Sequence, residues 1–271
     1  MSQFPREKEA ARAFWYVGIF WVLTFISGIH VEARPVVRHE NPFAFARPIA
    51  PSLRAKRYVE VFDSALAQQI GQFDSERGLV RHTVPEGSPG VGPEVALLDR
   101  WERKRYISPA NMWANYVGRS SANLICAMAL ARTQPLSRYY RDPDLLRSIR
   151  QGFRAFEAMQ LPSGEFAFTP LRYATIYGSH AMAWWLENLI AAWFCVADEL
   201  PEEERARSWA MLNRAMAFLR DTPCDHACNR GMVWTAVMSV CGRATGDSTY
   251  LRDANAMFDR IRGQIFQSSG E

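Results

Sequence analysis

Two short polar segments of this sequence stand directly before strongly apolar runs. One spans residues 177–180 (Tyr-Gly-Ser-His), and the other spans residues 228–231 (Cys-Asn-Arg-Gly). If each apolar run is a helix, each polar segment lies at a helix N-terminus, where backbone N–H groups are free and the helix dipole is positive. Two such termini that face one cleft would hold an anionic ligand. The sequence therefore predicts an anion-binding site built at helix starts.

The first segment carries groups suited to sugar binding and proton transfer. On a helix, His180, Trp184 and Glu187 fall at positions i, i+4 and i+7 and share a face. The indoles of Trp184 and Trp185 offer flat apolar surfaces on which sugar rings stack, although two adjacent Trp residues point in different directions and we expect at least one in the core. His180 titrates near neutrality and is a candidate proton-transfer group. It could equally be a helix cap.

The second segment supplies an amide and an arginine. Asn229 stands at a helix start, where Asn is also favoured simply as an N-cap. Arginine can hold a carboxylate through two parallel hydrogen bonds, which makes Arg230 and Arg172 candidate ligand-binding residues. Arg119 stands at a comparable place near the start of another apolar run. Tyr177 completes the candidate ligand-binding set.

Other catalytic signatures are missing from the sequence. It has no G-x-S-x-G, no H-E-x-x-H and no Gly-Lys-Ser/Thr phosphate loop. Five cysteines at irregular spacing do not form a disulfide framework. Cys224, His226 and Cys228 share one loop, but a fourth zinc ligand is not evident, so a Cys224–Cys228 bridge or a plain loop is the preferred interpretation. We predict neither a metal nor a cofactor.

Charge and composition limit the classes of ligand that we expect the protein to bind. The formal net charge of the 271-residue chain is +4, and Arg greatly outnumbers Lys. A nucleic-acid-binding protein would show clustered basic residues, so nucleic acid is not an expected partner. A few local arginines are compatible with an acidic small or polymeric ligand.

The N-terminus resembles a targeting segment. Residues 14–29 are uncharged and apolar, and they are followed by Val31-Glu32-Ala33, a small-x-small cleavage pattern. We interpret residues 1–33 as a signal peptide and expect a secreted or periplasmic protein. A membrane anchor at 14–29 is the second interpretation, because the run is short for a bilayer span. A buried first helix is the third.

Helical periodicity dominates the remaining sequence. Residues 34–52 form a proline-rich extended lead-in, and residues 53–271 form the folded domain, with a loop-rich stretch at 73–107 and few strands. The expected helices are 53–71, 108–132, 142–159, 179–199, 202–220, 229–245 and 249–266.

Their alternation suits an all-α fold with two concentric layers. The very apolar helices 108–132, 179–199 and 229–245 would form the inner layer, and amphipathic helices such as 142–159 the outer one. This predicts an incomplete α/α toroid of antiparallel helical hairpins, with an irregular helical bundle as the alternative. Similar turns recur at 72–78, 160–165 and 267–271. Because the sequence stops within the last of these, we expect an N-terminal portion of a longer protein.

From Ala183 onward the chain resembles the α/α-toroid domain of polysaccharide lyases, most of all family 8, whose members cleave hyaluronate, chondroitin or xanthan. Trp184-Trp185 before Glu187 resembles the family's aromatic patch, residues 227–230 resemble the motif of its catalytic Asn, and residues 265–271 resemble the run before its catalytic His and Tyr. Ala183 stands where the family often has Asn, and the family's His and Tyr would lie beyond Glu271. Heparinase II/III-like and alginate lyases are looser relatives.

The resemblance implies β-elimination in a uronic-acid-containing polysaccharide. Asn229 would neutralise the substrate carboxylate and stabilise the enolate that forms when the neighbouring proton leaves. His180 would transfer protons, and the Trp pair and arginines would hold sugar rings and acidic groups. Two other functions remain open from the residues themselves. One is a glycoside hydrolase or epimerase on the same scaffold, and the other is a non-catalytic carbohydrate-binding helical protein.

Overall fold

The computed structural model describes residues 43, 50–80, 109–166, 182–223 and 229–268; the side chains of 109–117, 229–230 and 265–268 are outside the description. The described residues are mainly α-helical, as the periodicity predicts. The elements are α2 (Leu53–Ile70), β1 (Phe73–Asp74), β2 (Leu79–Val80), α4 (Pro109–Thr133), α5 (Pro143–Met159), α7 (Leu186–Val196), the 3-10 helix η2 (Ala197–Glu199), α8 (Glu202–Asp221), α9 (Asn229–Thr245) and α10 (Ser248–Ser268).

Local sequence explains where two of these helices begin. The Ser52 hydroxyl accepts a hydrogen bond from the Ala55 N–H and caps α2, while Asp142 caps α5 through the N–H groups of its second and third residues. Pro143, the first residue of α5, has no N–H to leave unsatisfied there. Caps of this kind contribute about 1 kcal/mol each. The expected helix boundaries at 53 and 142 therefore agree with the structure to within one residue.

Successive helices pair as hairpins. Gly152 of α5 packs against Ile125 of α4, and the Trp193 indole of α7 donates a hydrogen bond of 3.1 Å to the Ser208 hydroxyl of α8. Helices α9 and α10 pack on each other in the same way across the turn at 246–247. Each apolar helix is thereby covered by the amphipathic helix that follows it.

Across hairpins, by contrast, neighbouring helices run parallel. Asn188, near the start of α7, meets Asn123 of α4, and Glu199, just after α7, meets Arg132 in the last turn of α4 at 2.5 Å. Both contacts advance in the same direction along the two helices. An up-and-down bundle would place antiparallel helices side by side. The α4–α7 pair therefore forms a parallel row.

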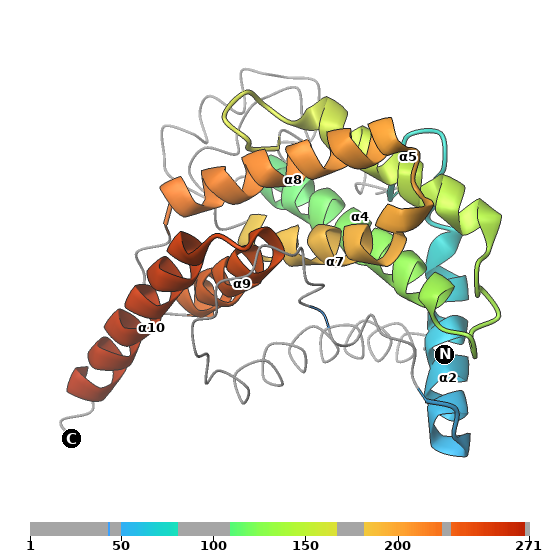
Figure 1. The fold of residues 1–271 in the computed structure, drawn as a ribbon, viewed down its shortest axis with the longest axis horizontal. Helices are drawn as coiled ribbons and strands as arrows, with labels where there is room; N and C mark the ends of the chain where they lie inside the picture. The colour runs from blue at the N-terminus through green and yellow to red at the C-terminus, as the bar shows by residue number, and fades with distance from the viewer. Residues whose placement is uncertain (1–42, 44–49, 81–108, 167–181, 224–228, 269–271) are drawn as a thin grey trace, which may run out of the picture.

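Helices α5 and α8 form a second parallel row. Arg150 of α5 binds Glu204 near the start of α8, and Gln160 at the end of α5 donates a hydrogen bond of 2.9 Å to the Met211 carbonyl further along α8. Figure 1 shows α5 and α8 on one side, α4 and α7 beneath them, the α9–α10 hairpin at one end and α2 at the other. Helix α7 is mostly buried between its neighbours.

The predicted helix 179–199 is wrong in one respect. Continuous helix begins only at Leu186, because the backbone at Trp185 leaves helical geometry (φ −148°, ψ −11°). Trp184 and Glu187 therefore do not share a helical face through regular i, i+3 spacing. The break lets the Trp185 indole enter the core while Trp184 stays half-buried.

Two of the recurring turns have the same construction. Gly78 follows α2 and has φ +74°; Gly164 follows α5 and has φ +94°. A side chain at Gly78 would collide with the Gln151 carbonyl of α5, and one at Gly164 would collide with the Arg214 carbonyl of α8. Each turn thus needs glycine both for its backbone conformation and for close approach to the next amphipathic helix. The third turn lies largely outside the described residues.

The described helices contain no segment long and apolar enough to cross a bilayer. The apolar run at 14–29, on which the signal-peptide and anchor interpretations depend, is outside the described residues, as is most of the lead-in at 34–52.

Candidate ligand-binding site

A seam between α4 and α7 carries paired polar and aromatic side chains, and we call these pairs rungs. In the first rung the guanidinium carbon of Arg119 lies 5.1 Å from the centre of the Trp184 ring. Both side chains are half-buried. Arg119 projects from α4, and Trp184 stands in the turn just before α7. A cation over an indole face is attracted by the ring quadrupole, so the pair fixes the orientation of both groups.

The second rung lies one helical turn further along. The Asn188 amide donates a hydrogen bond of 2.7 Å to the Asn123 side-chain oxygen. Asn123 follows Arg119 by four residues, one turn of α4, and Asn188 stands in the first turn of α7 after the break at Trp185, so the rungs succeed each other along the seam. Both Asn side chains are half-buried. The seam therefore presents a cation, an indole and two amides in order.

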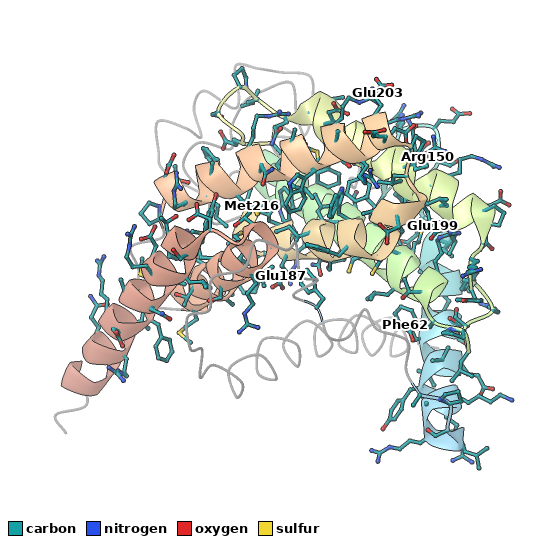
Figure 2. All side chains as sticks on the ribbon, viewed as in Figure 1. Phe62, Arg150, Glu187, Glu199, Glu203 and Met216 are labelled. Carbon is teal, nitrogen blue, oxygen red and sulfur yellow. The ribbon has the colours of Figure 1, made fainter. Side chains whose placement is uncertain are left out.

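Glu187 lies beside these rungs, in the first turn of α7 and on the side of that helix away from α8 (Figure 2). Among the described residues it forms no hydrogen bond or ion pair, and burial raises the pKa of its carboxyl from 4.5 to about 7. It sits near the thiols of Cys126 on α4 and Cys241 on α9. Burial is the main cause that raises the pKa of both thiols, and the nearby Glu187 carboxylate raises both a little further. Glu187 can exchange a proton near neutral pH, whereas these thiols stay protonated.

Trp185 does not belong to the site, which corrects the prediction that both indoles bind substrate. Its side chain is 1% exposed, and its ring centre lies 5.5 Å from that of Phe156 and 5.2 Å from that of Phe166. A ring enclosed by core aromatics cannot stack on a sugar. Trp185 is the core member of the Trp pair, as the sequence allowed for one of the two.

The side chains of the remaining predicted site residues are outside the description. Tyr177, His180 and Arg172 lie outside the described residues. Asn229 and Arg230 are the first two residues of α9, so Asn229 stands at a helix start as predicted, but their side chains are outside the description. The convergence of Asn229 with Trp184 stays a prediction.

Asn123, Asn188 and the acid–base potential of Glu187 were not predicted from the sequence. The spacing held a signal for the two amides, because Arg119 and Asn123, like Trp184 and Asn188, are four residues apart. What the sequence could not provide was the parallel pairing of α4 and α7, which brings the two series together.

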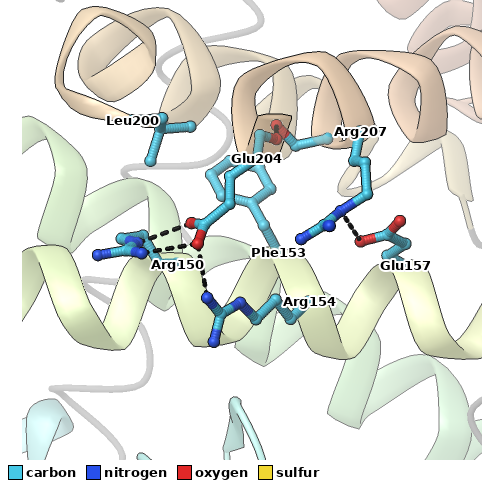
Figure 3. Close-up of a pocket in the computed structure, with 8 residues that line it drawn as sticks. Arg150, Phe153, Arg154, Glu157, Leu200, Glu204 and Arg207 are labelled. Atoms are coloured by element: carbon cyan, nitrogen blue, oxygen red, sulfur yellow. Dashed lines mark hydrogen bonds and ion pairs between the residues drawn. The ribbon is translucent and has the colours of Figure 1, made fainter. Parts of the chain in front are cut away.

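A second polar cluster lies in the hollow between α5 and α8 and is structural. Figure 3 shows Arg150 and Arg154 on one carboxylate, that of Glu204, and Arg207 on Glu157. The hydrogen bonds from the two arginines lower the pKa of Glu204 to about 2. Because Arg207 also pairs with Glu203, three arginines face three carboxylates, and the cluster joins two helices and leaves little net charge for a ligand.

No three His, Cys, Asp or Glu side chains gather as a metal site in the part of the chain that the structure describes. The loop with Cys224, His226 and Cys228 falls outside that part.

Comparison with known proteins gives no identification. No protein-family model matches the chain, and no curated protein is significantly similar to it.

Proposed function

We propose that this protein is a polysaccharide lyase that cleaves uronic-acid-containing polysaccharide by β-elimination, with the α4–α7 seam as part of its substrate-binding wall. The observation that carries the proposal is the Arg119–Trp184 rung, in which a half-buried cation lies over a half-buried indole. A uronate ring requires the same two groups, a cation for its carboxylate and a flat apolar surface for its ring.

The helix arrangement supports an α/α toroid as the scaffold. Hairpins whose equivalent helices run parallel are the unit of such a toroid, and α4–α5 and α7–α8 are related in this way. We also propose that these hairpins are part of a closed ring. In such an arrangement the starts of α4, α7 and α9 would border one cleft, with Asn229 at the start of α9.

The proposed reaction begins when a base takes the proton next to the uronate carboxylate. The carbon–hydrogen electron pair forms the new double bond, the bond to the 4-linked oxygen breaks, and a proton is delivered to that oxygen. Asn229 would hydrogen-bond the carboxylate and stabilise the enolate. We assign His180 to proton transfer and Tyr177, Arg172 and Arg230 to substrate binding, as in the sequence-based prediction.

A glycoside hydrolase or epimerase on the same scaffold is a second candidate, favoured by one observation. Glu187 is half-buried in the first turn of α7, and burial raises its carboxyl pKa to about 7, which suits a general acid. Hydrolysis also requires a second carboxylate across the bond to be cleaved. The described residues place no such partner opposite Glu187, so we prefer the lyase.

The test is incubation of the full chain with hyaluronate, chondroitin, alginate, heparin and xanthan. A lyase produces an unsaturated uronate whose double bond absorbs in the ultraviolet, whereas a hydrolase releases reducing ends without that absorbance. We expect absorbance with at least one polymer and a loss of about tenfold or more in Arg119→Ala, since one charge-assisted hydrogen bond contributes about 1.5–3 kcal/mol. Reducing ends without absorbance would favour the second candidate.

Arg147→Ala is the matched control for that variant. Arg147 is an exposed arginine on α5 whose one ion pair among the described residues is with Asp144 one turn away, so its loss removes the same charge outside the α4–α7 seam. An equal loss of activity in Arg147→Ala would show that net charge, and not the rung, governs binding.

The proposed site of action is outside the cytoplasm, with an acidic polysaccharide as partner. Mass determination of the N-terminus of the exported protein tests this. Cleavage after Ala33 supports the signal peptide, and an intact residue 1 in a membrane fraction supports the anchor.

A further inference from the structure

The Asn123–Asn188 pair holds more hydrogen-bonding capacity than it uses. An Asn side chain has two N–H donors and an oxygen with two lone pairs. The single bond of 2.7 Å between the two amides leaves the Asn188 oxygen and the Asn123 NH₂ group without a hydrogen bond to any described group. Both side chains are only half-buried. Reversing both amides exchanges the two roles but leaves the same pattern, one donor group beside one acceptor.

That pattern matches two neighbouring hydroxyl groups on a sugar ring. Each hydroxyl both donates and accepts, so one can donate to the Asn188 oxygen while the other accepts from the Asn123 amide. The two amides carry no charge, which suits a neutral hydroxyl. Moving a hydroxyl out of water costs less free energy when an amide replaces its hydrogen bonds to water than when nothing does. An isolated amide pair needed only to join two helices would have no requirement for solvent access.

The distance of the Asn123–Asn188 pair from the first rung determines which sugar ring of a bound polymer would contact the pair. Asn123 lies one helical turn from Arg119, and a turn rises about 5.4 Å, which is close to the length of one sugar residue. A chain whose uronate lies on Arg119 and Trp184 would therefore place its next ring over the two amides. We infer that Asn123 and Asn188 form a subsite for the vicinal hydroxyls of the sugar ring adjacent to the bound uronate.

This inference rests on the proposed binding of a uronate polymer at the seam. The alternative is a purely structural role for the Asn123–Asn188 pair. The pair would then only fix the register of α4 against α7, as Gln160 joins α5 to α8 through the Met211 carbonyl at 2.9 Å. A register contact affects stability and all ligands alike. A subsite affects only ligands that carry the hydroxyls.

The experiment compares two probes by calorimetry with the full chain. The first is a tetrasaccharide of alternating 4-linked glucuronate and glucose. The second is the same tetrasaccharide with O2 and O3 of each glucose methylated. We expect wild-type protein to bind the first at least tenfold more tightly. In Asn123→Ala and Asn188→Ala that ratio should fall to about one, mainly through weaker binding of the first probe. Gln160→Ala, which removes an interhelical hydrogen bond between α5 and α8, is the matched control and should keep the wild-type ratio.

Asn123→Ser and Asn188→Ser provide smaller polar replacements if either alanine variant fails to fold, and they too should lower the ratio. A ratio near one in wild-type protein, or a ratio that stays at its wild-type value in folded variants, would overturn the subsite. Absence of binding by both probes would overturn the proposed function together with the subsite. Binding with the expected ratio but without unsaturated product would overturn only the lyase.

Discussion

The guanidinium of Arg119 and the ring of Trp184 lie 5.1 Å apart across the seam between α4 and α7. Such a contact contributes about 0.5–2 kcal/mol, depending on exposure. It holds the chain just before α7 against α4 at the point where the helix is interrupted. The same two side chains supply the charge and the apolar surface on which the proposed binding of a uronate depends.

Removing the charge of that pair should weaken binding of acidic sugars selectively. We expect Arg119→Ala to lower the affinity for tetraglucuronate about tenfold, because one charge-assisted hydrogen bond is lost. The affinity for an uncharged oligosaccharide should change little. Calorimetric titration of both ligands tests this. Equal loss for both would mean that Arg119 only orders the Trp184 turn.

The two adjacent indoles should differ sharply in their effect on stability. Trp185→Ala removes a fully buried ring from between Phe156 and Phe166, so the free energy of unfolding should fall by about 3–5 kcal/mol. Trp184→Ala removes a half-buried ring and should cost about 1–2 kcal/mol. Urea denaturation measures both. Similar values for the two variants would contradict the assignment of Trp185 to the core.

The turn after α5 should not tolerate a side chain. Gly164→Ala combines a φ of +94° with a collision against the Arg214 carbonyl, and we expect at least about 2 kcal/mol of destabilisation. Gly71→Ala is the control, because Gly71 has a φ of −61° and open space around it. A neutral Gly164→Ala variant in thermal unfolding would mean that this turn does not lie against α8.

Stability should decline between acidic and neutral pH because of Glu187. Its carboxyl pKa is about 7 in the folded protein and ordinarily 4.5, so the folded state holds a proton that the unfolded state has already released. The resulting stabilisation is complete below pH 4.5, decreases as the pH rises toward 7 and is absent above that value. Its upper bound is about 3 kcal/mol.

Glu187→Gln removes this titration while keeping the size and polarity of the side chain. The difference in free energy of unfolding between wild type and this variant should therefore shift in favour of the variant from pH 5 to pH 8. Denaturation at four or five pH values measures it. A difference that is constant with pH would show that Glu187 is ionised throughout.

Individual helices show which features of the fold can be predicted from the sequence. Apolar periodicity predicted nearly all helix boundaries because it is a local signal, and the structure shows that the local caps Ser52 and Asp142 fix two of them. The break before α7 was not predictable, since it arises where the Trp185 indole packs against Phe156 and Phe166 of other segments. The sequence alone does not show which of the two adjacent indoles is buried, because burial depends on residues far away in the chain.

In the candidate site, too, some residues can be predicted from the local sequence and others only from the packing of helices. Arg119 and Trp184 were identified from their types and places near helix starts, whereas Asn123 and Asn188 become a pair only through the parallel packing of α4 and α7. Burial of Glu187, and hence its raised carboxyl pKa, also depends on neighbouring helices that no local pattern specifies.

The most direct measurement is a crystal structure of the full chain with a bound uronate tetrasaccharide. The account predicts a uronate carboxylate within hydrogen-bonding distance of the Arg119 guanidinium and a sugar ring against the Trp184 indole. A tetrasaccharide bound elsewhere, with the α4–α7 seam empty, would contradict it.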